Sequence, residues 1–351
     1  MLATREQLVK ELNTCPEGKK LTEVELEILP EGALELLPSE HPQLPNSRMV
    51  TSIAMGGFAD IYKAQMKSKS EKGNGRTVVV KVFRDAHLKY KGSPKAKAEY
   101  INGLRREYAV WGLLNHKNIN LLDGLVIHRD LPSPGLVSEF KKHGDLTEFT
   151  RNRGSYDRLH MGRGVACGLG YLHSNGVIHG DLTVLNILVD EETRADGSVT
   201  FFPLITDFGK SRLMGEDGFT TKAPNRAMFH LPPELIDHDP AEGDPVTNKV
   251  LTFASDVYSF ALVLLEIITG KVPYSQENML PRKIPTAITE SALRPTLAKY
   301  PVLDPSYEFC WPILEACWKG KKEDRITIQE AHDHLCNPGS EWKASQNAEK
   351  N

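Results

Sequence analysis

Three polar side chains lie close together in the stretch VIHGDLTVLNIL, which is otherwise almost wholly apolar: His179, Asp181 and Asn186. Burying an unpaired carboxylate among apolar groups costs several kcal/mol. These groups therefore either pair with one another or face a cleft and meet a ligand. A further aspartate, Asp207, follows an apolar run in PLITDFGKS, where Gly209 permits the chain to bend. Aspartate and asparagine oxygens are ligands that Mg²⁺ takes together with phosphate oxygens.

A lysine and a glutamate nearer the N-terminus could complete such a site. In TVVVKVF, strand alternation puts Lys81 on one face with Val79 and Phe83. In the helix expected around residues 100–114, Glu107 falls inside an apolar stripe made by Tyr100, Leu104, Tyr108 and Trp111. A carboxylate on an apolar face needs a cation, and Lys81 is available. Ordinary alternatives stay open, namely a snorkelling edge lysine and a glutamate that bends to water.

Together these residues predict phosphoryl transfer. They supply a cation for phosphate, a carboxylate that holds this cation, two oxygen ligands for a metal and one further carboxylate. The turn in AMGGFADIYKA adds Gly56 and Gly57, where the backbone could approach a phosphate closely. Two adjacent glycines between strands are also the mark of a simple hairpin.

The elements that must position these residues change character along the chain. Residues 48–140 are strand-rich with one helix, and residues 141–337 are mostly helical, which predicts a small sheet lobe followed by a larger helical lobe. Residues 1–47 form an acidic, proline-containing extension, either a partner-binding arm or a disordered segment. Residues 338–351 are a polar tail that we expect to be loose.

Bulk properties exclude several classes of function. A net charge of -3 gives no general attraction to nucleic acid or anionic membranes. The most apolar run, VYSFALVLLEII, is too short to span a bilayer and predicts a buried helix over 256–269. The five scattered cysteines suit a reducing compartment, and the charged N-terminus lacks a secretory signal, so we expect a cytoplasmic location. We also expect a monomer or transient dimer.

The order and spacing of the motifs resemble the eukaryotic protein kinase family, in particular its tyrosine-kinase-like group. The resemblance covers roughly residues 48 to 337, and the motifs are AMGGFADIYK, VVVK with Lys81, Glu107, HGDLTVLN, DFG at 207–209, PPE at 232–234, SDVYSF at 255–260 and CWKGKKEDR at 317–325. It implies a bilobal α+β fold, with a small antiparallel β-sheet N-lobe carrying one helix and a larger, mostly α-helical C-lobe.

The resemblance also implies roles for individual residues. Lys81 would hold ATP phosphates with Glu107 orienting it, Asp181 would accept the proton of the substrate hydroxyl, and Asn186 and Asp207 would bind Mg²⁺. The implied nucleotide-binding set is Ile53, Ala54, Met55, Gly56, Gly57, Phe58, Ala59, Ile61, Val79, Lys81, Ser138, Glu139, Lys141, Leu188 and Asp207.

Three further implied arrangements concern the fold rather than the nucleotide. Trp111, Phe208 and His179 would stack as a hydrophobic spine. Glu234 would pair with Arg325. Asp256 would start the buried helix and bind the backbone of the loop that carries His179. Such a buried acid is structural rather than catalytic.

The implied function is that of a protein kinase in signal transduction, dependent on ATP and Mg²⁺, with serine or threonine favoured over tyrosine as acceptor. Its substrate would be a protein, and the partner of residues 1–47 is unknown. The alternative is a pseudokinase scaffold that binds partners without turnover. The departures that support this alternative are Ala54, Ala59, Gly180, Thr183 and Ala227, each replacing a residue that is usual in the family.

Overall fold

The computed structural model describes residues 26–37, 54–55, 59–67, 75–83, 93–153, 155–213, 227–236 and 251–339. The chain divides into two compact units. Unit 1 comprises Met1–Lys142 and Thr206–Ser211, and unit 2 comprises His143–Ile205 and Arg212–Asn351. The architecture is α+β, with an antiparallel sheet in unit 1 and mostly helices in unit 2, as the sequence predicts.

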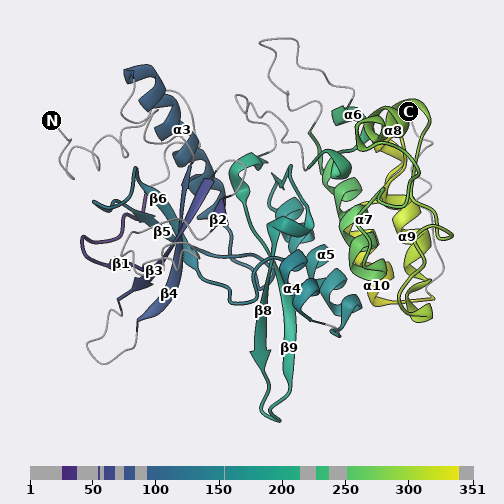
Figure 1. The fold of residues 1–351 in the computed structure, drawn as a ribbon, viewed down its shortest axis with the longest axis horizontal. Coiled ribbons are helices and arrows are strands. Elements are labelled where there is room, and N and C mark those ends of the chain that lie inside the picture. The colour runs from purple at the N-terminus through teal and green to yellow at the C-terminus, as the bar shows by residue number, and fades with distance from the viewer. Residues whose placement is uncertain are drawn as a thin grey trace. The chain divides into compact units, whose positions relative to one another are not determined.

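Unit 1 is built on a six-stranded sheet in the spatial order β1-β3-β4-β6-β5, with β2 paired to β3 (Figure 1). Its strands are β1 (Leu34–Leu36), β2 (Ala54–Met55), β3 (Ala59–Met66), β4 (Arg76–Phe83), β5 (Leu122–Val126) and β6 (Gly135–Glu139). The predicted alternation in β4 is confirmed, because Val78, Val80 and Val82 are at most 1% exposed while their neighbours are not buried. Lys81 lies in register with Ile61 on one side and Leu136 on the other.

The helix of unit 1 is α3 (Pro94–Trp111). Ser93 caps its N-terminus by accepting a hydrogen bond from the Ala96 amide, and Pro94 fits the first turn because its missing N–H has no helical partner there. The predicted apolar stripe is buried, and Glu107 is buried within it at 3% exposure. The burial of a carboxylate in this position requires a partner.

Part of the predicted N-terminal extension belongs to the sheet. Strand β1 pairs antiparallel with β3, and Ile28 forms a parallel bridge with Leu125 of β5. The boundary at residue 47 and a partner-binding role for residues 1–47 stay predictions, but residues 26–37 are packed within unit 1.

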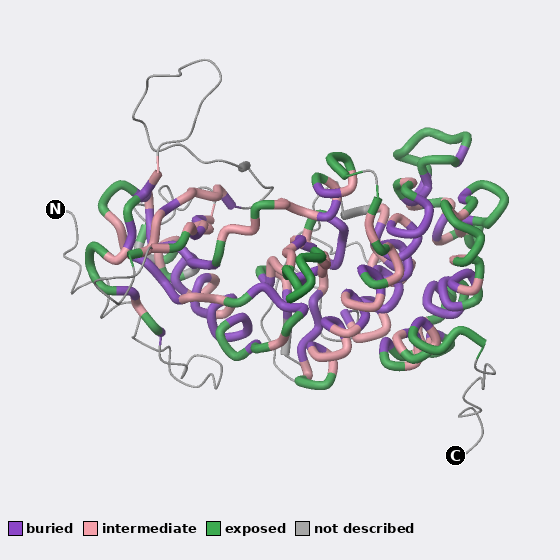
Figure 2. Tube along the Cα trace, turned by 90° about the horizontal axis from the view of Figure 1, so that it is seen from below, coloured by how far each residue is buried: buried purple, intermediate pink, exposed green. Residues whose placement is uncertain are grey.

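Unit 2 is organised around α7 (Phe253–Thr269), a helix of 17 residues of which most are buried. The helix begins with a reciprocal capping box between Thr252 and Ser255 and ends at Gly270, whose φ of 67° favours glycine. It packs against α5 (Arg158–Ser174) and α9 (Cys310–Cys317). In Figure 2 the long exposed stretches fall mainly on the connections between such buried elements. The predicted buried helix over 256–269 is therefore confirmed.

The remaining elements of unit 2 are shorter. The helices are α4 (Leu146–Asn152), α6 (Pro233–Ile236), α8 (Ile284–Glu290) and α10 (Ile328–Cys336). The strands are β7 (Val177–Ile178), which pairs with β10 (Arg212–Leu213), and the hairpin β8 (Ile187–Thr193) with β9 (Val199–Ile205). Among the described helices, none is both long and apolar enough to cross a bilayer. Most of the predicted polar tail lies outside the described residues.

Candidate active site

The polar centre of unit 1 is the ammonium group of Lys81, which lies between two carboxylates. Its Nζ is 2.7 Å from Glu107 Oε1 and 2.7 Å from Asp207 Oδ1. Lys81 comes from β4, Glu107 from α3 and Asp207 from the turn after β9. Glu107 is 26 positions and Asp207 is 126 positions from Lys81 in sequence. The Glu107 side chain is 2% exposed, whereas that of Asp207 is 41% exposed. The predicted pairing of Lys81 with Glu107 is therefore present, and Asp207 joins it.

The electrostatics of this cluster follow from burial and proximity. Burial alone would lower the pKa of the Lys81 ammonium, but the charges of Asp207 and Glu107 outweigh burial and raise this pKa above its ordinary value. For Glu107, burial raises the pKa and the Lys81 charge opposes this shift. Lys81 is thus cationic at neutral pH, with one buried and one accessible counter-charge.

Asp207 owes its position to an uncommon backbone conformation. Its φ of 66° and ψ of 74° place it in the left-handed region, and its Oδ1 accepts a hydrogen bond from the Gly209 amide at 3.3 Å. A Cβ atom on Gly209 would lie 3.1 Å from Glu107 Oε2, so glycine leaves room for the buried carboxylate. Left-handed backbone at a non-glycine residue stores strain that often marks a functional site.

Phe208 fixes the turn from the other side. It is 1% exposed, and its ring centroid lies 5.8 Å from that of Trp111 at the end of α3. This is the predicted stacking of two members of the hydrophobic spine. The third member, His179, belongs to unit 2 and is buried there, so its stacking on Phe208 stays a prediction.

The loop with His179 is held by Asp256, near the start of α7. The Asp256 carboxylate accepts hydrogen bonds from the backbone amides of His179 and Gly180, both at 2.8 Å. It also lies 3.0 Å from the His173 ring nitrogen Nε2. The predicted structural role of Asp256 is confirmed, since a buried carboxylate with three donors orders the loop.

Within this loop, Asn186 donates from Nδ2 to the backbone oxygen of Asp181 at 2.8 Å and to its carboxylate at 3.4 Å. The Asn186 Oδ1 has no hydrogen bond in the described part of the chain. Both side chains are only partly buried. The acid and the amide therefore hydrogen-bond to each other and are both partly exposed, which explains why such groups are tolerated beside apolar neighbours.

The predicted nucleotide-binding residues fall in both units. In unit 1, Ile61 and Val79 lie on β3 and β4, Ser138 is buried on β6, and the Lys141 ammonium lies 2.7 Å from the Glu139 carboxylate. Leu188 lies on β8 in unit 2. Ala54, Met55 and Ala59 belong to β2 and β3, while Ile53, Gly56, Gly57 and Phe58 lie outside the described residues.

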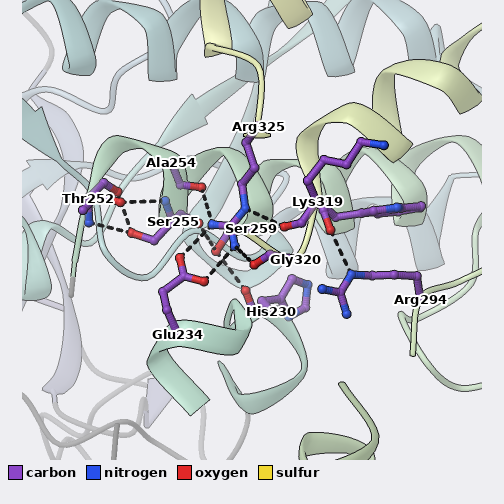
Figure 3. Close-up of polar contacts among 11 residues, drawn as sticks. His230, Glu234, Thr252, Ala254, Ser255, Ser259, Arg294, Lys319, Gly320 and Arg325 are labelled. Carbon is purple, nitrogen blue, oxygen red and sulfur yellow. Dashed lines mark hydrogen bonds and ion pairs between the residues drawn. The ribbon is translucent and has the colours of Figure 1, made fainter. Parts of the chain in front are cut away.

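The predicted pair of Glu234 and Arg325 is confirmed in unit 2 (Figure 3). The two guanidinium Nη atoms each lie 2.7 Å from a different carboxylate oxygen of Glu234. The remaining donors of Arg325 reach the backbone oxygens of Ala254, Lys319 and Gly320 at 3.0, 2.9 and 3.3 Å. This arginine is fully committed to structure and has no donor left for a ligand.

Sequence reasoning missed two titratable groups in unit 2. His230 is buried, and neither of its ring nitrogens has a hydrogen-bond partner among the described residues, although its backbone oxygen accepts a hydrogen bond from the Ser259 hydroxyl (Figure 3). Burial lowers the pKa of this histidine to about 4. Glu266 lines a cavity of about 310 Å³, where burial, with a smaller effect of Asp145, raises its pKa to about 7. Neither position carries a sequence signal, because each reads as an isolated polar residue in an apolar run.

Comparison with known proteins places the chain among kinases. A model of protein tyrosine and serine/threonine kinases matches residues 48–335. The serine/threonine-protein kinase STY46 of Arabidopsis thaliana is 28% identical over 81% of this chain and 42% of its own length. STY17 of the same plant is 26% identical over 74% of this chain and 40% of its own. Ephrin type-A receptor 1 of Homo sapiens is 28% identical over 81% and 26%. The chain thus spans less than half the length of each relative.

Proposed function

Because the chain belongs to the protein tyrosine and serine/threonine kinase family, we propose that it transfers the γ-phosphate of ATP to a hydroxyl group of a protein. Serine or threonine is the favoured acceptor. Proteins of this family are usually ATP-dependent phosphotransferases, and catalysis in them is mostly positioning and charge stabilisation. The observation that carries the proposal is the Lys81 ammonium held 2.7 Å from both Glu107 and Asp207.

Lys81 is suited to binding the α- and β-phosphates. Its raised pKa keeps it charged, and the 2% exposed Glu107 fixes its direction without competing for the ligand. Asp207 is the more accessible of its two partners, so it can exchange Lys81 for another cation when nucleotide enters. A compact ammonium is appropriate here, because it can move between oxygen partners at little geometric cost.

The oxygen donors fit Mg²⁺. Asp207 offers an accessible carboxylate, and Asn186 offers an Oδ1 without a hydrogen bond in the described part of the chain. Hard oxygen ligands of this kind are those that Mg²⁺ takes together with phosphate and water. Bound Mg²⁺ supplies neutralisation of the phosphate charge during transfer. We propose that Asn186 and Asp207 each bind Mg²⁺.

Asp181 is the proposed acceptor of the substrate hydroxyl proton. Its backbone oxygen is fixed by Asn186 at 2.8 Å, and its loop is fixed by Asp256 through the amides of His179 and Gly180. A carboxylate on a loop that is fixed in this way needs no large rearrangement to accept a proton. We propose that Ile61, Val79 and Leu188 enclose the adenine, with the backbone after Ser138 as its hydrogen-bonding partner.

Transfer of label from radioactive Mg-ATP to Ser, Thr and Tyr peptides tests this function. We expect wild-type turnover on Ser or Thr peptides and its loss in Lys81→Met, Asp181→Asn and Asp207→Ala. A far-UV spectrum and melting temperature close to wild type for Asp181→Asn would show that this loss is chemical. If wild type and Asp181→Asn label themselves and every peptide to the same extent, the proposal is wrong.

A pseudokinase is the second candidate, and one observation favours it. Gly180, where an arginine is usual in this family, has a φ of 76°, in the left-handed region that favours glycine. Ala59, one of the two alanines at usual glycine positions, is 5% exposed in β3, and its Cβ is accommodated in the packed sheet. A thermal shift on addition of Mg-ATP without turnover would support a binding scaffold. Neither shift nor turnover would indicate a fold that does not use nucleotide.

A further inference from the structure

Residues 26–37, the N-terminal strap, join two edges of the sheet in unit 1. Near its end, β1 pairs with β3, and the Leu37 amide donates to the Lys63 backbone oxygen at 2.9 Å. Near its start, the Leu29 amide donates to the Leu125 oxygen at 2.8 Å, and the Leu125 amide donates to the Glu27 oxygen at 2.9 Å. Strands β1 and β5 end the sheet on opposite sides, so the strap closes the sheet on itself.

The strap is part of the core of unit 1. Four of its leucines are at most 9% exposed: Leu26, Leu29, Leu34 and Leu36. On β5, Gly124 has a φ of 137°, and a Cβ at this position would lie 2.8 Å from the Glu27 backbone oxygen. Only glycine therefore lets the strap approach β5 this closely. The glycine in β5 therefore allows the strap to pack against this edge of the sheet.

One contact connects the strap to the helix that carries Glu107. The backbone amide of Glu27 donates to the Tyr108 hydroxyl at 2.7 Å, and Tyr108 is 6% exposed on α3. Tyr108 follows Glu107 directly, so the two side chains leave the helix about 100° apart. The strap contacts the Tyr108 side chain, and Lys81 contacts the Glu107 side chain. A rotation of α3 that withdraws Glu107 must therefore also break the contact to Glu27.

We propose that the N-terminal strap sets the rotation of α3, with Tyr108 as a positioning residue that keeps Glu107 in reach of Lys81. Tyr108 acts through Glu107 and touches no reacting group. Its consequence for turnover rests on the proposed kinase function, whereas its consequence for the order of the strap and of α3 does not. Because the strap is part of the same chain and is fixed to both edges of the sheet, the rotation of α3 is set without a second protein.

The full-length Tyr108→Phe variant tests this proposal, with Tyr100→Phe as its matched control. Both tyrosines lie on α3 at 6% exposure, but the Tyr100 hydroxyl contacts Ser133 and the Pro134 backbone oxygen rather than the strap. Each change removes one buried hydroxyl from the same helix. A general loss of helix stability therefore affects both variants, whereas only Tyr108→Phe removes a hydrogen bond to the strap.

Hydrogen exchange of the backbone amides and Mg-ATP turnover are the two measurements. In Tyr108→Phe we expect exchange in residues 26–37 and in the second half of α3 to rise about tenfold relative to Tyr100→Phe, the effect of one lost buried hydrogen bond. We expect kcat to fall by a similar factor while KM for the peptide stays unchanged. Because the exchange experiment needs no turnover, an inactive wild type would contradict the kinase proposal and leave this measurement decisive for the strap.

A second variant keeps the test valid if Tyr108→Phe does not fold. Leu29→Ala loosens the strap at β5, away from α3, and should also speed exchange in α3 and lower kcat. In the double variant the two effects should not add, since both act by releasing the strap. Exchange in α3 and kcat equal to those of Tyr100→Phe, in a variant whose strap exchanges faster, would overturn the proposal. Unchanged exchange of the strap itself would overturn it as well.

Discussion

Two ion pairs of the molecule join the same kinds of charge at the same distance, yet the two cations differ in their further partners and in their exposure. Lys81 Nζ lies 2.7 Å from Glu107 in unit 1, and the Arg325 guanidinium lies 2.7 Å from Glu234 in unit 2. Lys81 has a second carboxylate partner, Asp207, which is 41% exposed. The Arg325 side chain is 0% exposed and is saturated by backbone oxygens.

The difference shows that the type of cationic side chain determines whether an ion pair serves structure or ligand binding. A guanidinium distributes five donors in a fixed plane, so a complete set of acceptors locks it in place. An ammonium is a compact charge that can exchange one oxygen partner for another. The Arg325 pair is thus suited to holding α6 and α7 together, and the Lys81 cluster is suited to receiving a ligand. Four experiments test this contrast.

The largest effect on stability should come from Arg325→Met. It removes the cation from a pair whose arginine is fully buried, and it removes the hydrogen bonds that Arg325 donates to the backbone oxygens of Ala254, Lys319 and Gly320. We expect the free energy of unfolding to fall by about 3–5 kcal/mol. Urea denaturation measures this loss. Arg325→Lys should recover only part of it, and full recovery would mean that charge alone matters at this site.

Asp207→Asn should show the opposite behaviour. Turnover should fall about 10²–10³-fold, as for the loss of one charge-stabilising group, because an amide replaces the proposed metal-binding carboxylate. The free energy of unfolding should change by less than about 1 kcal/mol, since the side chain is 41% exposed and Lys81 keeps Glu107. Asparagine also tolerates the left-handed backbone. Steady-state labelling tests the loss of turnover, and urea denaturation of the same preparation tests the small change in stability. A large loss of stability would mean that Asp207, like Arg325, is a structural residue.

His230 should make unit 2 sensitive to acid. Its pKa is lowered to about 4 in the folded chain against 6.5 ordinarily, so the unfolded chain binds the extra proton between these values. The free energy of unfolding should therefore fall by about 2–3 kcal/mol as pH drops from 6.5 to 4. Denaturation at several pH values measures this, and His230→Phe should flatten the profile. The exposed His160→Gln should not, and equal profiles for both variants would exclude His230 as the cause.

Glu266 should give a smaller change of the opposite sign. Its pKa is raised to about 7 from 4.5, so the folded chain binds the extra proton between these values. Stability from this group is present below pH 4.5 and is lost as pH rises through 7. Glu266→Gln should thus raise the free energy of unfolding at pH 8 by about 1–2 kcal/mol, a value reduced for partial solvation. Denaturation at pH 5 and pH 8 tests it, with Glu290→Gln as the exposed control that should show no gain.

Periodicity and motif order predicted much of this molecule. The alternation in TVVVKVF and the apolar stripe of α3 gave the correct faces of both elements, because side-chain direction repeats every two residues in a strand and every 3.6 in a helix. The pairing of Glu234 with Arg325 and the role of Asp256 followed from motif resemblance. The strap did not follow, since prolines at 30 and 38 suggested broken structure while β1 forms between them.

The amino-acid sequence alone established which segments form strands and helices, and which polar residues interrupt otherwise apolar segments. The folded chain was needed to show that Asp207 joins Lys81 and Glu107 from 126 positions away. It was also needed to show that His230 is buried with neither ring nitrogen hydrogen-bonded among the described residues. The physical reason is range. Local patterns depend on hydrogen bonds and side-chain directions within a few residues, whereas partners distant in sequence are chosen by how the whole chain closes around its core.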